Sequence, residues 1–577
     1  MNGLSRGTPR HGYRFLLGWL AGAILAAAIL TIFFLIPVFE LLKLGFGELT
    51  VRVTDGGLAA LSQILDDTGA WSALLTTLLL AAGGTALATV FGVPAAYILY
   101  CREFPGRVLL RFLVVFPFVL PTVAVSAAMR ALFDEGGWLG WIPMPPAAMI
   151  VTAMLFFNLS VVARTVGATW GLLNPDYAAL ARTLGAGPLR VFMTVTWPRI
   201  RGAVLSAVTV VFLYCSTAYG LVMVLGGTHT RTLETEIYRQ TSEYLNLASA
   251  AVLSILQIVV VTVALLISRA AQRQAQRGAN SETGRRAGAG VRPLQHRDLP
   301  LLTGVSALIT VVIVLPLLQV VVRSLRRGGR WSVTNYLDLL RPGAARGIDY
   351  PIAATITESL RSALLATGIA LVLATGVALL LTRHIPSATR NLDRHLGTLQ
   401  TSIDVLFMLP LGVSAVTLGF GMLVALGGPL RWVADTPLLV PVAQALVAVP
   451  ILIRIIVPAL NRTDWRLYGV AASLGAGPLR AFSAVEWPML RRALGTAAGF
   501  AFGITIGEFS ATSFLVLQHD PTLPVMIYRL LARAGAADQG MAYAGTVLLC
   551  ALAAAAMGLA ETTAENRRVN IQKGTLK

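Results

Sequence analysis

The sequence predicts an all-α polytopic membrane protein of about twelve transmembrane helices, built as two homologous halves of six helices each. Two observations support this prediction, the apolar composition and an internal repeat. Of the 577 residues, 56% are hydrophobic and only 13% are charged, and the mean hydropathy is +0.73. Soluble proteins carry about 25% charged residues, so we expect a lipid bilayer to cover this much apolar surface.

Twelve apolar runs are long enough to cross a bilayer, because about 20 helical residues span its hydrocarbon core. Lipid requires each backbone polar group to be paired within its own segment, and the runs lack the alternation of barrel strands. The first run is too long for a signal-peptide core, so we expect it to be retained. The expected spans lie near 15–42, 71–100, 109–133, 146–173, 202–226, 247–268, 300–323, 360–382, 400–427, 436–460, 492–517 and 540–561.

Arginine placement predicts the orientation. The net charge is +19, and it comes almost entirely from arginines that cluster between apolar runs. Basic loops stay in the cytoplasm, so this charge indicates membrane topology rather than a nucleic-acid partner. We expect a multi-pass inner membrane protein with both termini in the cytoplasm. One loop conflicts with this, because 323–346 carries six arginines although the span count places it outside. Either the rule is overridden there or one span is misread.

An internal repeat divides the chain. Residues 181–190 (ARTLGAGPLR) match 471–480 (AASLGAGPLR) at all but two positions. The same offset also aligns 232–239 with 522–529, far along the chain. Such agreement over separated stretches predicts a first half at 1–268, a cytoplasmic linker at 269–299 and a second half at 300–577.

The repeated segment, 174–200 and again 463–490, is polar and reads as helix–turn–helix on the cytoplasmic face. Asn174 can cap the first helix, and Gly185 stands where a helix ends in a left-handed residue. Gly187 and Pro188 then start a second short helix, which we expect to stop before Trp197. The corresponding residues of the second copy are Thr463 or Asp464 as the cap and Gly475 as the stop.

Both copies resemble the cytoplasmic signature of ABC importer permeases: Glu-Ala-Ala, three residues, Gly, nine residues, then Ile-x-Leu-Pro. The glycines and prolines match in spacing, whereas the glutamate is missing from both copies and tryptophan replaces leucine. The resemblance implies a type I importer permease whose two loops couple to an ATPase. The coupling residues it implies are Ala181, Leu184, Gly185, Ala186, Gly187 and Pro188, and Ala471, Leu474, Gly475, Ala476, Gly477 and Pro478.

Within that family the chain resembles the fused permeases for thiamine and for ferric iron. The stretches that support this are 102–107 (REFPGR), 156–159 (FFNL), 232–238 (TLETEIY) and 507–512 (GEFSAT). The resemblance implies one of these two cargoes, or thiamine phosphate, with iron slightly ahead. Sulfate, polyamine or another small anion stays open. It also implies an extracytoplasmic substrate-binding protein and two copies of a cytoplasmic ABC ATPase.

The chain itself is expected to be a permease subunit and not an enzyme. A phosphate-binding loop requires Gly-Lys-Ser/Thr, and none of the three lysines follows a glycine, so ATP is expected on the partner subunit and no cofactor on this chain. The three cysteines show no paired spacing, so no metal site is expected.

Polar residues within spans are candidates for the translocation path, since a charge at mid-membrane costs about 2.5–3.5 kcal/mol. Glu508 in the eleventh span and Asn158 in the fourth are the two candidates. A helix-packing hydrogen bond is the alternative role for Glu508. The alternative for the whole chain is a secondary transporter of twelve helices, which is also built from repeats. Such a carrier typically binds ions through several mid-membrane carboxylates and has no need of matched cytoplasmic loops.

Overall fold

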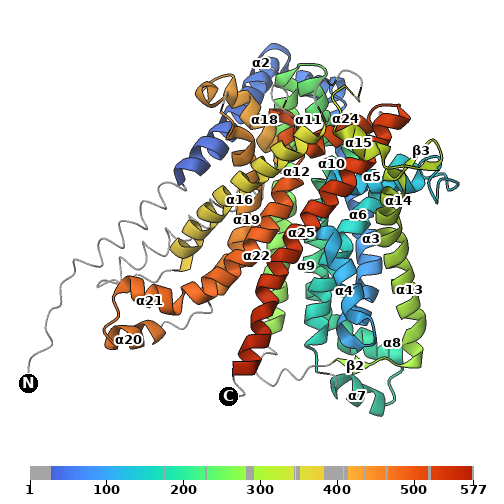
Figure 1. Ribbon diagram of the computed structural model, residues 1–577, viewed down its shortest axis with the longest axis vertical. Helices are drawn as coiled ribbons and strands as arrows, with labels where there is room; N and C mark the ends of the chain where they lie inside the picture. Colours follow the sequence, from blue (N-terminus) through green and yellow to red (C-terminus); the bar gives the residue numbers. More distant parts are fainter. Residues whose placement is uncertain are drawn as a thin grey trace, which may run out of the picture. The chain divides into compact units, whose positions relative to one another are not determined.

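The protein is almost entirely helical in its computed structural model, which confirms the expected all-α polytopic fold (Figure 1). Strands in the described part of the chain are limited to two short pairs, β1 (Arg102–Glu103) with β2 (Arg292–Pro293) and β3 (Arg326–Arg327) with β4 (Arg330–Trp331). The structure describes residues 27–574 except 175, 228–229, 281–290, 344, 346–347, 349–350, 383–406, 408–412, 435, 462–465 and 517–520.

Nine helical segments among these residues are long and apolar enough to cross a membrane. Each overlaps one of the expected spans. The first helix differs most in extent, because α2 (Ile36–Asp67) continues where a loop was expected at 43–70. The nine segments are Ala27–Val51, Ala70–Cys101, Pro146–Gly171, Pro188–Ser216, Leu247–Gln272, His296–Ser324, Ala353–Thr382, Leu439–Asn461 and Ala536–Gly558.

The three remaining expected spans are short or broken helices. Pro117 and Pro121 divide the run at 109–133 into α4 (Arg107–Val115), a 3-10 turn and α5 (Thr122–Phe133). Proline lacks an amide hydrogen and its ring collides with the preceding turn, which accounts for the break. The other two runs contain α18 (Ala415–Leu426) and the pair α22 (Trp487–Ile506) and α23 (Thr512–Leu515).

The chain folds into two compact units, each drawing on both ends of the sequence. Unit 1 takes Met1–Leu41, Thr357–Asp520 and Ala551–Lys577, and unit 2 takes Leu42–Ile356 and Pro521–Cys550. The repeat predicts two halves that are homologous in sequence, and these differ from the two units into which the chain packs. The boundaries of the halves stay a prediction. Helices α2, α16 (Ala353–Thr382) and α25 (Ala536–Gly574) contribute to both units.

The remaining elements fall within one unit each. Unit 1 holds α18, α19 (Leu439–Asn461), α20 (Arg466–Ser473), α21 (Pro478–Val485), α22 and α23. Unit 2 holds α3 (Ala70–Cys101), α4, α5, α6 (Pro146–Gly171), α7 (Asp176–Thr183), α8 (Pro188–Val191), α9 (Trp197–Ser216), α10 (Tyr219–Leu225), α11 (Leu233–Ser242), α12 (Leu247–Asn280), α13 (Leu299–Ile309), α14 (Leu315–Ser324), α15 (Thr334–Leu339), α24 (Leu523–Leu531) and all four strands.

Glycines bring α3 and α6 into close contact in the core of unit 2. A Cβ atom on Gly84 would lie 2.7 Å from Met154 Sδ, and one on Gly92 would lie 2.6 Å from Val162 Cβ. Both distances are far below a normal contact. Because lipid provides no hydrophobic drive between helices, small residues that permit close packing stabilise such pairs.

The first helix of each half packs in the unit formed mainly by the other half. Leu30 and Phe34, at the start of the chain, lie in the unit 1 core among residues of α16 and α19. Val305 and Ile309, just after the linker, lie in the unit 2 core among residues of α3 and α6. The two halves of the sequence have therefore exchanged their first spans.

A buried ion pair lies at the C-terminal end of α3 in unit 2. The parallel pairing of β1 with β2 places Arg102 beside the segment that precedes α13. Arg102 Nε lies 3.0 Å from Asp298 Oδ2, and both side chains are about 5% exposed. The Tyr97 hydroxyl accepts a further hydrogen bond from Arg102 Nε at 3.1 Å. This group ties the end of α3 to the last residues of the expected linker, directly before α13.

The basic loop at 323–346 lies at the end of unit 2 opposite α7 and α8. Helices α13 and α14 run from β2, near α8, to β3 at the other end (Figure 1). Arg323 donates to the carbonyl oxygens of Asp134 and Glu135, and Arg327 and Arg341 both pair with Asp338. Three of the six arginines therefore have local partners. The side of the membrane on which this loop lies stays a prediction.

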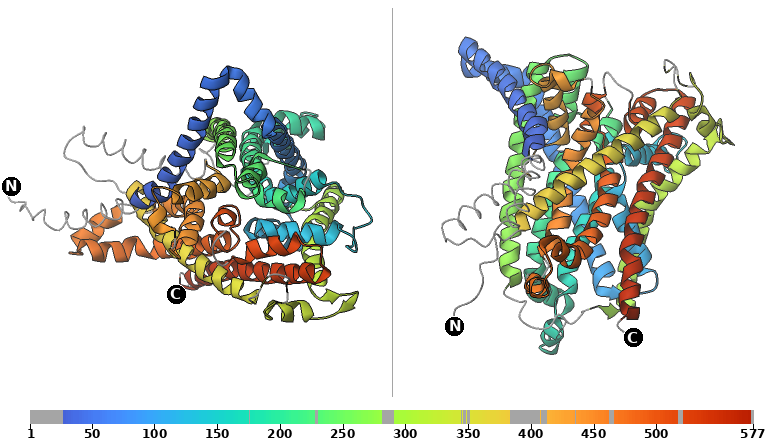
Figure 2. Two further views of the ribbon diagram at one scale, coloured as in Figure 1. Left: turned by 90° about the horizontal axis from the view of Figure 1, so that it is seen from above. Right: turned by 60° about the vertical axis from the view of Figure 1, so that its left-hand side comes forward.

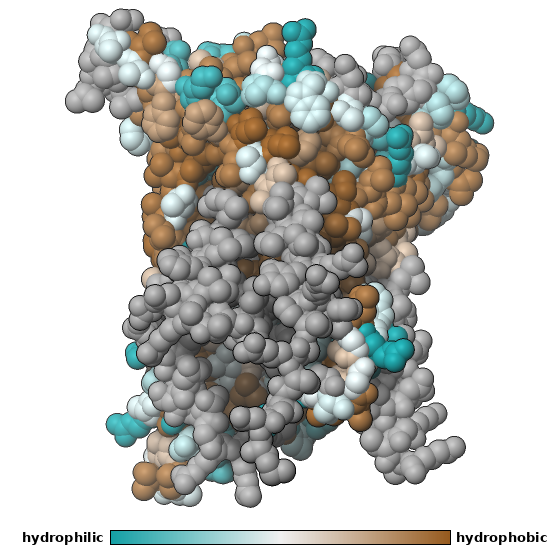
Figure 3. Space-filling view, turned by 90° about the vertical axis from the view of Figure 1, so that its left-hand side faces the viewer, coloured by the Kyte–Doolittle hydropathy of each residue, from teal (hydrophilic) through white to brown (hydrophobic). Residues whose placement is uncertain are grey.

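In unit 1, α19 and α22 lie side by side (Figures 1 and 2, orange). Pro450 and Pro458 lie within α19, where the close partner helix supports the weakened hydrogen-bond ladder. Apolar side chains cover most of the coloured surface on the face shown in Figure 3. Such a surface is expected of helices that face lipid.

Candidate functional site

The first repeated loop is a short helix closed at both ends. The backbone N–H of Asp176 donates to Asn174 Oδ1 at 2.9 Å, which is the expected capping contact. At the other end Gly185 has φ +80°, the left-handed conformation expected of a stop residue. The N–H of Ala186 bonds to Ala181 O at 3.0 Å and that of Gly185 to Arg182 O at 2.9 Å. These two bonds form a Schellman motif, which fixes the direction of the following chain.

The second loop repeats this closure in unit 1. Gly475 has φ +77°, and the N–H of Ala476 bonds to Ala471 O at 2.9 Å. Gly187 and Gly477 both adopt extended backbone immediately before a proline-started helix, as expected. The candidate caps Thr463 and Asp464 lie outside the described residues. Both loops therefore have the same stiff turn between two helices.

The expected end of the second helix before Trp197 is wrong for the first loop. There α8 passes through a π-helical turn at Phe192–Thr196 directly into α9. The wider turn lets the N–H of Trp197 bond to Phe192 O and accommodates the missing amide hydrogen of Pro198. In the second loop α21 does end at Val485, and the single turn residue Glu486 precedes α22.

Each loop exposes large apolar side chains at equivalent positions. Leu184 and Leu474 are both 81% exposed, while Leu189 and Leu479 are 70% and 75% exposed. Leu184 and Leu474 lie in the turns that follow α7 and α20, and Leu189 and Leu479 lie in the first turns of α8 and α21. Grouped apolar side chains rimmed by polar ones are typical of protein-binding surfaces.

The two pathway candidates both have partners inside their own packing environment. The carboxylate of Glu508 accepts the N–H groups of Ala511 at 2.8 Å and Thr512 at 3.0 Å, and so caps α23. Asn158 Nδ2 donates to Met154 O at 2.9 Å and to Cys215 Sγ at 3.4 Å. Glu508 belongs to unit 1 and Asn158 to unit 2. Their role in translocation stays a prediction.

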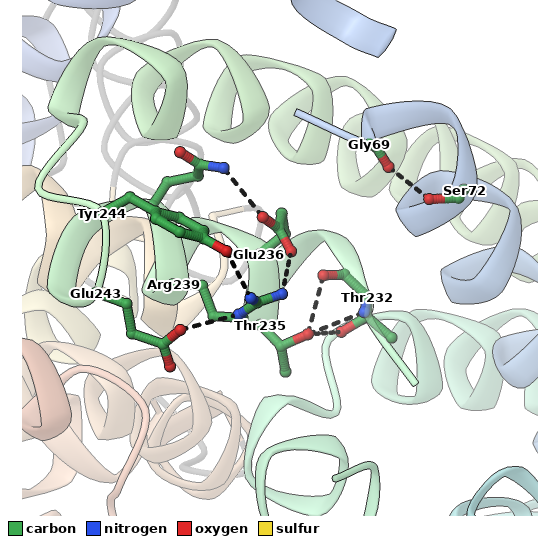
Figure 4. Close-up of polar contacts among 9 residues, drawn as sticks. Gly69, Ser72, Thr232, Thr235, Glu236, Arg239, Glu243 and Tyr244 are labelled. Carbon is green, nitrogen blue, oxygen red and sulfur yellow. Dashed lines mark hydrogen bonds and ion pairs between the residues drawn. The ribbon is translucent and has the colours of Figure 1, made fainter. Parts of the chain in front are cut away.

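The sequence reasoning missed a polar network on α11. Thr232 and Thr235 form a capping box, and Arg239 binds the carboxylates of Glu236 and Glu243 at 3.4 and 3.1 Å (Figure 4). Glu234 and Glu236 are only 2% and 3% exposed. A signal for this network was present in the repeat, because the second copy has apolar residues at both carboxylate positions.

Comparison with known proteins agrees with this geometry. Residues 88–277, which include the first loop, match the family "Binding-protein-dependent transport system inner membrane component". The chain is 27% identical over 533 residues to the thiamine transport system permease protein ThiP of Brucella abortus, covering 90% of this chain and 92% of that protein. It is 23% identical to ThiP of Salmonella typhimurium, covering 92% and 95%.

A shorter relative is closer in sequence. The sulfate transport system permease protein CysW of Synechocystis is 31% identical over 216 residues, which cover 35% of this chain and 78% of that protein. These similarities do not support the alternative of a secondary transporter. The matching loops, the helical fold and the relatives agree, and the chain belongs to the binding-protein-dependent transport system inner membrane components, as a fused, non-catalytic, multi-pass permease subunit of an ABC importer.

Proposed function

We propose that this chain imports thiamine or a thiamine phosphate across the inner membrane. The observation that carries the proposal is the end-to-end similarity to thiamine permeases, which covers 90% of this chain and 92% of the Brucella abortus protein. The sulfate permease matches only 35% of the chain. These names favour thiamine, while the expectation that ferric iron is slightly ahead has no support from them.

We further propose that the two loops each dock one ATPase subunit. Each loop offers an exposed leucine pair and a turn held by a Schellman-type bond, and both features recur at equivalent positions. Two equivalent surfaces suit two copies of one partner. The residues expected from the sequence, from Ala181 to Pro188 and from Ala471 to Pro478, supply these surfaces. ATP binds to that partner subunit, which hydrolyses it, and this chain needs no cofactor of its own.

This docking defines the orientation. If α7 and α8 face the ATPase in the cytoplasm, then α11, α15 and the β3–β4 hairpin of unit 2 face outward, where a substrate-binding protein delivers its cargo (Figure 1). The basic linker and both termini then lie in the cytoplasm, as the arginine distribution favours. Alternating access arises when the ATPase subunits close and move the two loops.

Uptake in a deletion strain tests the cargo. Labelled thiamine and labelled ferric iron are supplied to cells that lack the gene, with the gene restored, and with a Leu184→Glu/Leu474→Glu variant restored as the uncoupled control. We expect thiamine uptake to return only with the unaltered gene. Restoration of iron uptake alone would replace the proposed cargo, and restoration of neither would discard both.

A further inference from the structure

Helix α11 buries two carboxylates that have different surroundings. A carboxylate removed from water is retained only where donors or cations replace its hydration. For Glu236 these are Arg239 Nη1 at 3.4 Å and Gln240 Nε2 at 3.0 Å. Arg239 also binds Glu243 and the hydroxyl of Tyr244 (Figure 4), so the three residues share its guanidinium group.

Glu234 faces a second buried group, the amide of Gln257 on α12. Gln257 Nε2 donates to Glu234 Oε1 at 3.3 Å and to the carbonyl oxygen of Ser216 at 3.4 Å. Both partners offer only acceptors, which fixes the orientation of the amide. Gln257 is 0% exposed, and its Oε1 has no hydrogen-bond donor among the described residues. A buried carbonyl oxygen without a donor is uncommon, and here it lies beside a buried carboxylate.

Two tyrosines pack against each other where α10 meets α11. Tyr238 follows Glu234 by one helical turn and therefore shares its face of α11. Its ring centroid is 6.0 Å from that of Tyr219, which is 1% exposed and begins α10. The break between α9 and α10 releases the carbonyl oxygen of Ser216 from helical pairing. Broken helices of this kind line substrate sites in membrane transporters, and tyrosine faces attract cations.

The second half of the chain provides an internal comparison. The break between α22 and α23 stands at the same repeat offset as the break between α9 and α10, and it contains a buried carboxylate of its own, Glu508, which accepts the N–H groups of Ala511 and Thr512. The cluster on α11 and α12, however, has no acidic or amide counterpart at the repeat positions. The helix break therefore forms without that cluster. The residues equivalent to Tyr219, Glu234, Glu236 and Gln257 are Phe509, Pro524, Met526 and Val547.

We propose that Glu234, Gln257 and the Tyr219–Tyr238 pair form a binding site for an organic cation that carries an aromatic ring. The proposal rests on the proposed function, since thiamine contains a permanently charged thiazolium ring and an amino-substituted pyrimidine. The carboxylate of Glu234 balances the positive charge, and Gln257 Oε1 accepts a hydrogen bond from the amino group. The site lies at the end of unit 2 opposite the ATPase-docking helices α7 and α8 (Figure 1).

Uptake of labelled thiamine by variants of the full chain, expressed with its partner subunits, tests the site. We expect Glu234→Gln to lower uptake at least tenfold at an unchanged level of protein in the membrane. Gln257→Val, which introduces the residue of the second half, is a second variant expected to act in the same direction. Glu103→Gln removes an exposed carboxylate on β1, outside the proposed site, and should leave uptake within twofold of the unaltered protein.

The outcomes distinguish failure of the proposed binding site from failure of the proposed cargo. Thiamine uptake by the unaltered protein together with unchanged uptake by Glu234→Gln and Gln257→Val would overturn the site and leave the proposed function standing. If the unaltered protein transports no thiamine, the proposed function fails, and direct binding of labelled thiamine to the purified full chain decides the site. Binding that is lost in Glu234→Gln supports the site, whereas equal or absent binding overturns it.

Discussion

Valine at both loop glycines should uncouple ATP hydrolysis from transport. Gly185 and Gly475 have φ +80° and +77°, and a Cβ on either would meet no atom within 4 Å. The cost is therefore conformational rather than steric. A side chain held in such a backbone conformation costs about 1–3 kcal/mol, and a β-branched one is near the upper end. The double variant Gly185→Val/Gly475→Val thus weakens the two turns by about 2–6 kcal/mol together, and every 1.4 kcal/mol is a factor of ten.

Two readouts on the reconstituted importer check this expectation. Uptake should fall at least tenfold, while the ATPase subunits continue to hydrolyse ATP. Gly343→Val is the matched control, because Gly343 has φ +71° and open space but lies in the loop at the opposite end of unit 2. Uptake at the level of the unaltered protein in a well-expressed double variant would refute the coupling role of the turns.

Three further substitutions test other parts of the structure. Arg102→Met leaves the buried carboxylate of Asp298 without its cation, so we expect about 3–5 kcal/mol lower stability and a lower Tm of the purified protein. The added Asp298→Asn change should restore most of this loss. Gly92→Leu places a side chain where even a Cβ would lie 2.6 Å from Val162 of α6, so we expect the stability measured by thermal unfolding to fall by about 1–3 kcal/mol or more. Gly304→Leu is the control, because a Cβ at that position has no atom within 4 Å. Glu508→Ala removes a cap and should cost about 0.5–2 kcal/mol; uptake abolished at an unchanged Tm would instead assign the residue to the pathway.

The loops were predictable because their signals are local. A capping asparagine, a stop glycine and a glycine–proline start act within a few residues, and the duplication removed the ambiguity of a single copy. Long apolar runs likewise predicted most spans. The π-helical continuation through Phe192–Thr196 was missed because it depends on how the chain absorbs one missing amide hydrogen, which composition does not reveal.

What the sequence did not show depends on contacts between distant residues. Arg102 reads as one more cytoplasmic arginine until the strand pairing brings Asp298 to it. Arg323, Arg327 and Arg341 read as unpaired loop charges until Asp338 and two carbonyl oxygens are seen to bind them. The burial of Glu234 depends on α12 covering a helix that is polar by composition.

The exchange of first spans determines when unit 1 can finish packing during synthesis. The segment around Leu30 and Phe34 leaves the ribosome long before its packing partners, which begin only near Thr357. At about 5–20 residues per second, the intervening chain takes roughly 15–60 s to synthesise. Throughout that interval the first helix sits in the bilayer with its packing face open to lipid or to helper proteins. Completion of unit 1 is therefore necessarily a late, post-insertion event, and a nascent chain arrested at the linker would hold a first span that has not yet met its neighbours.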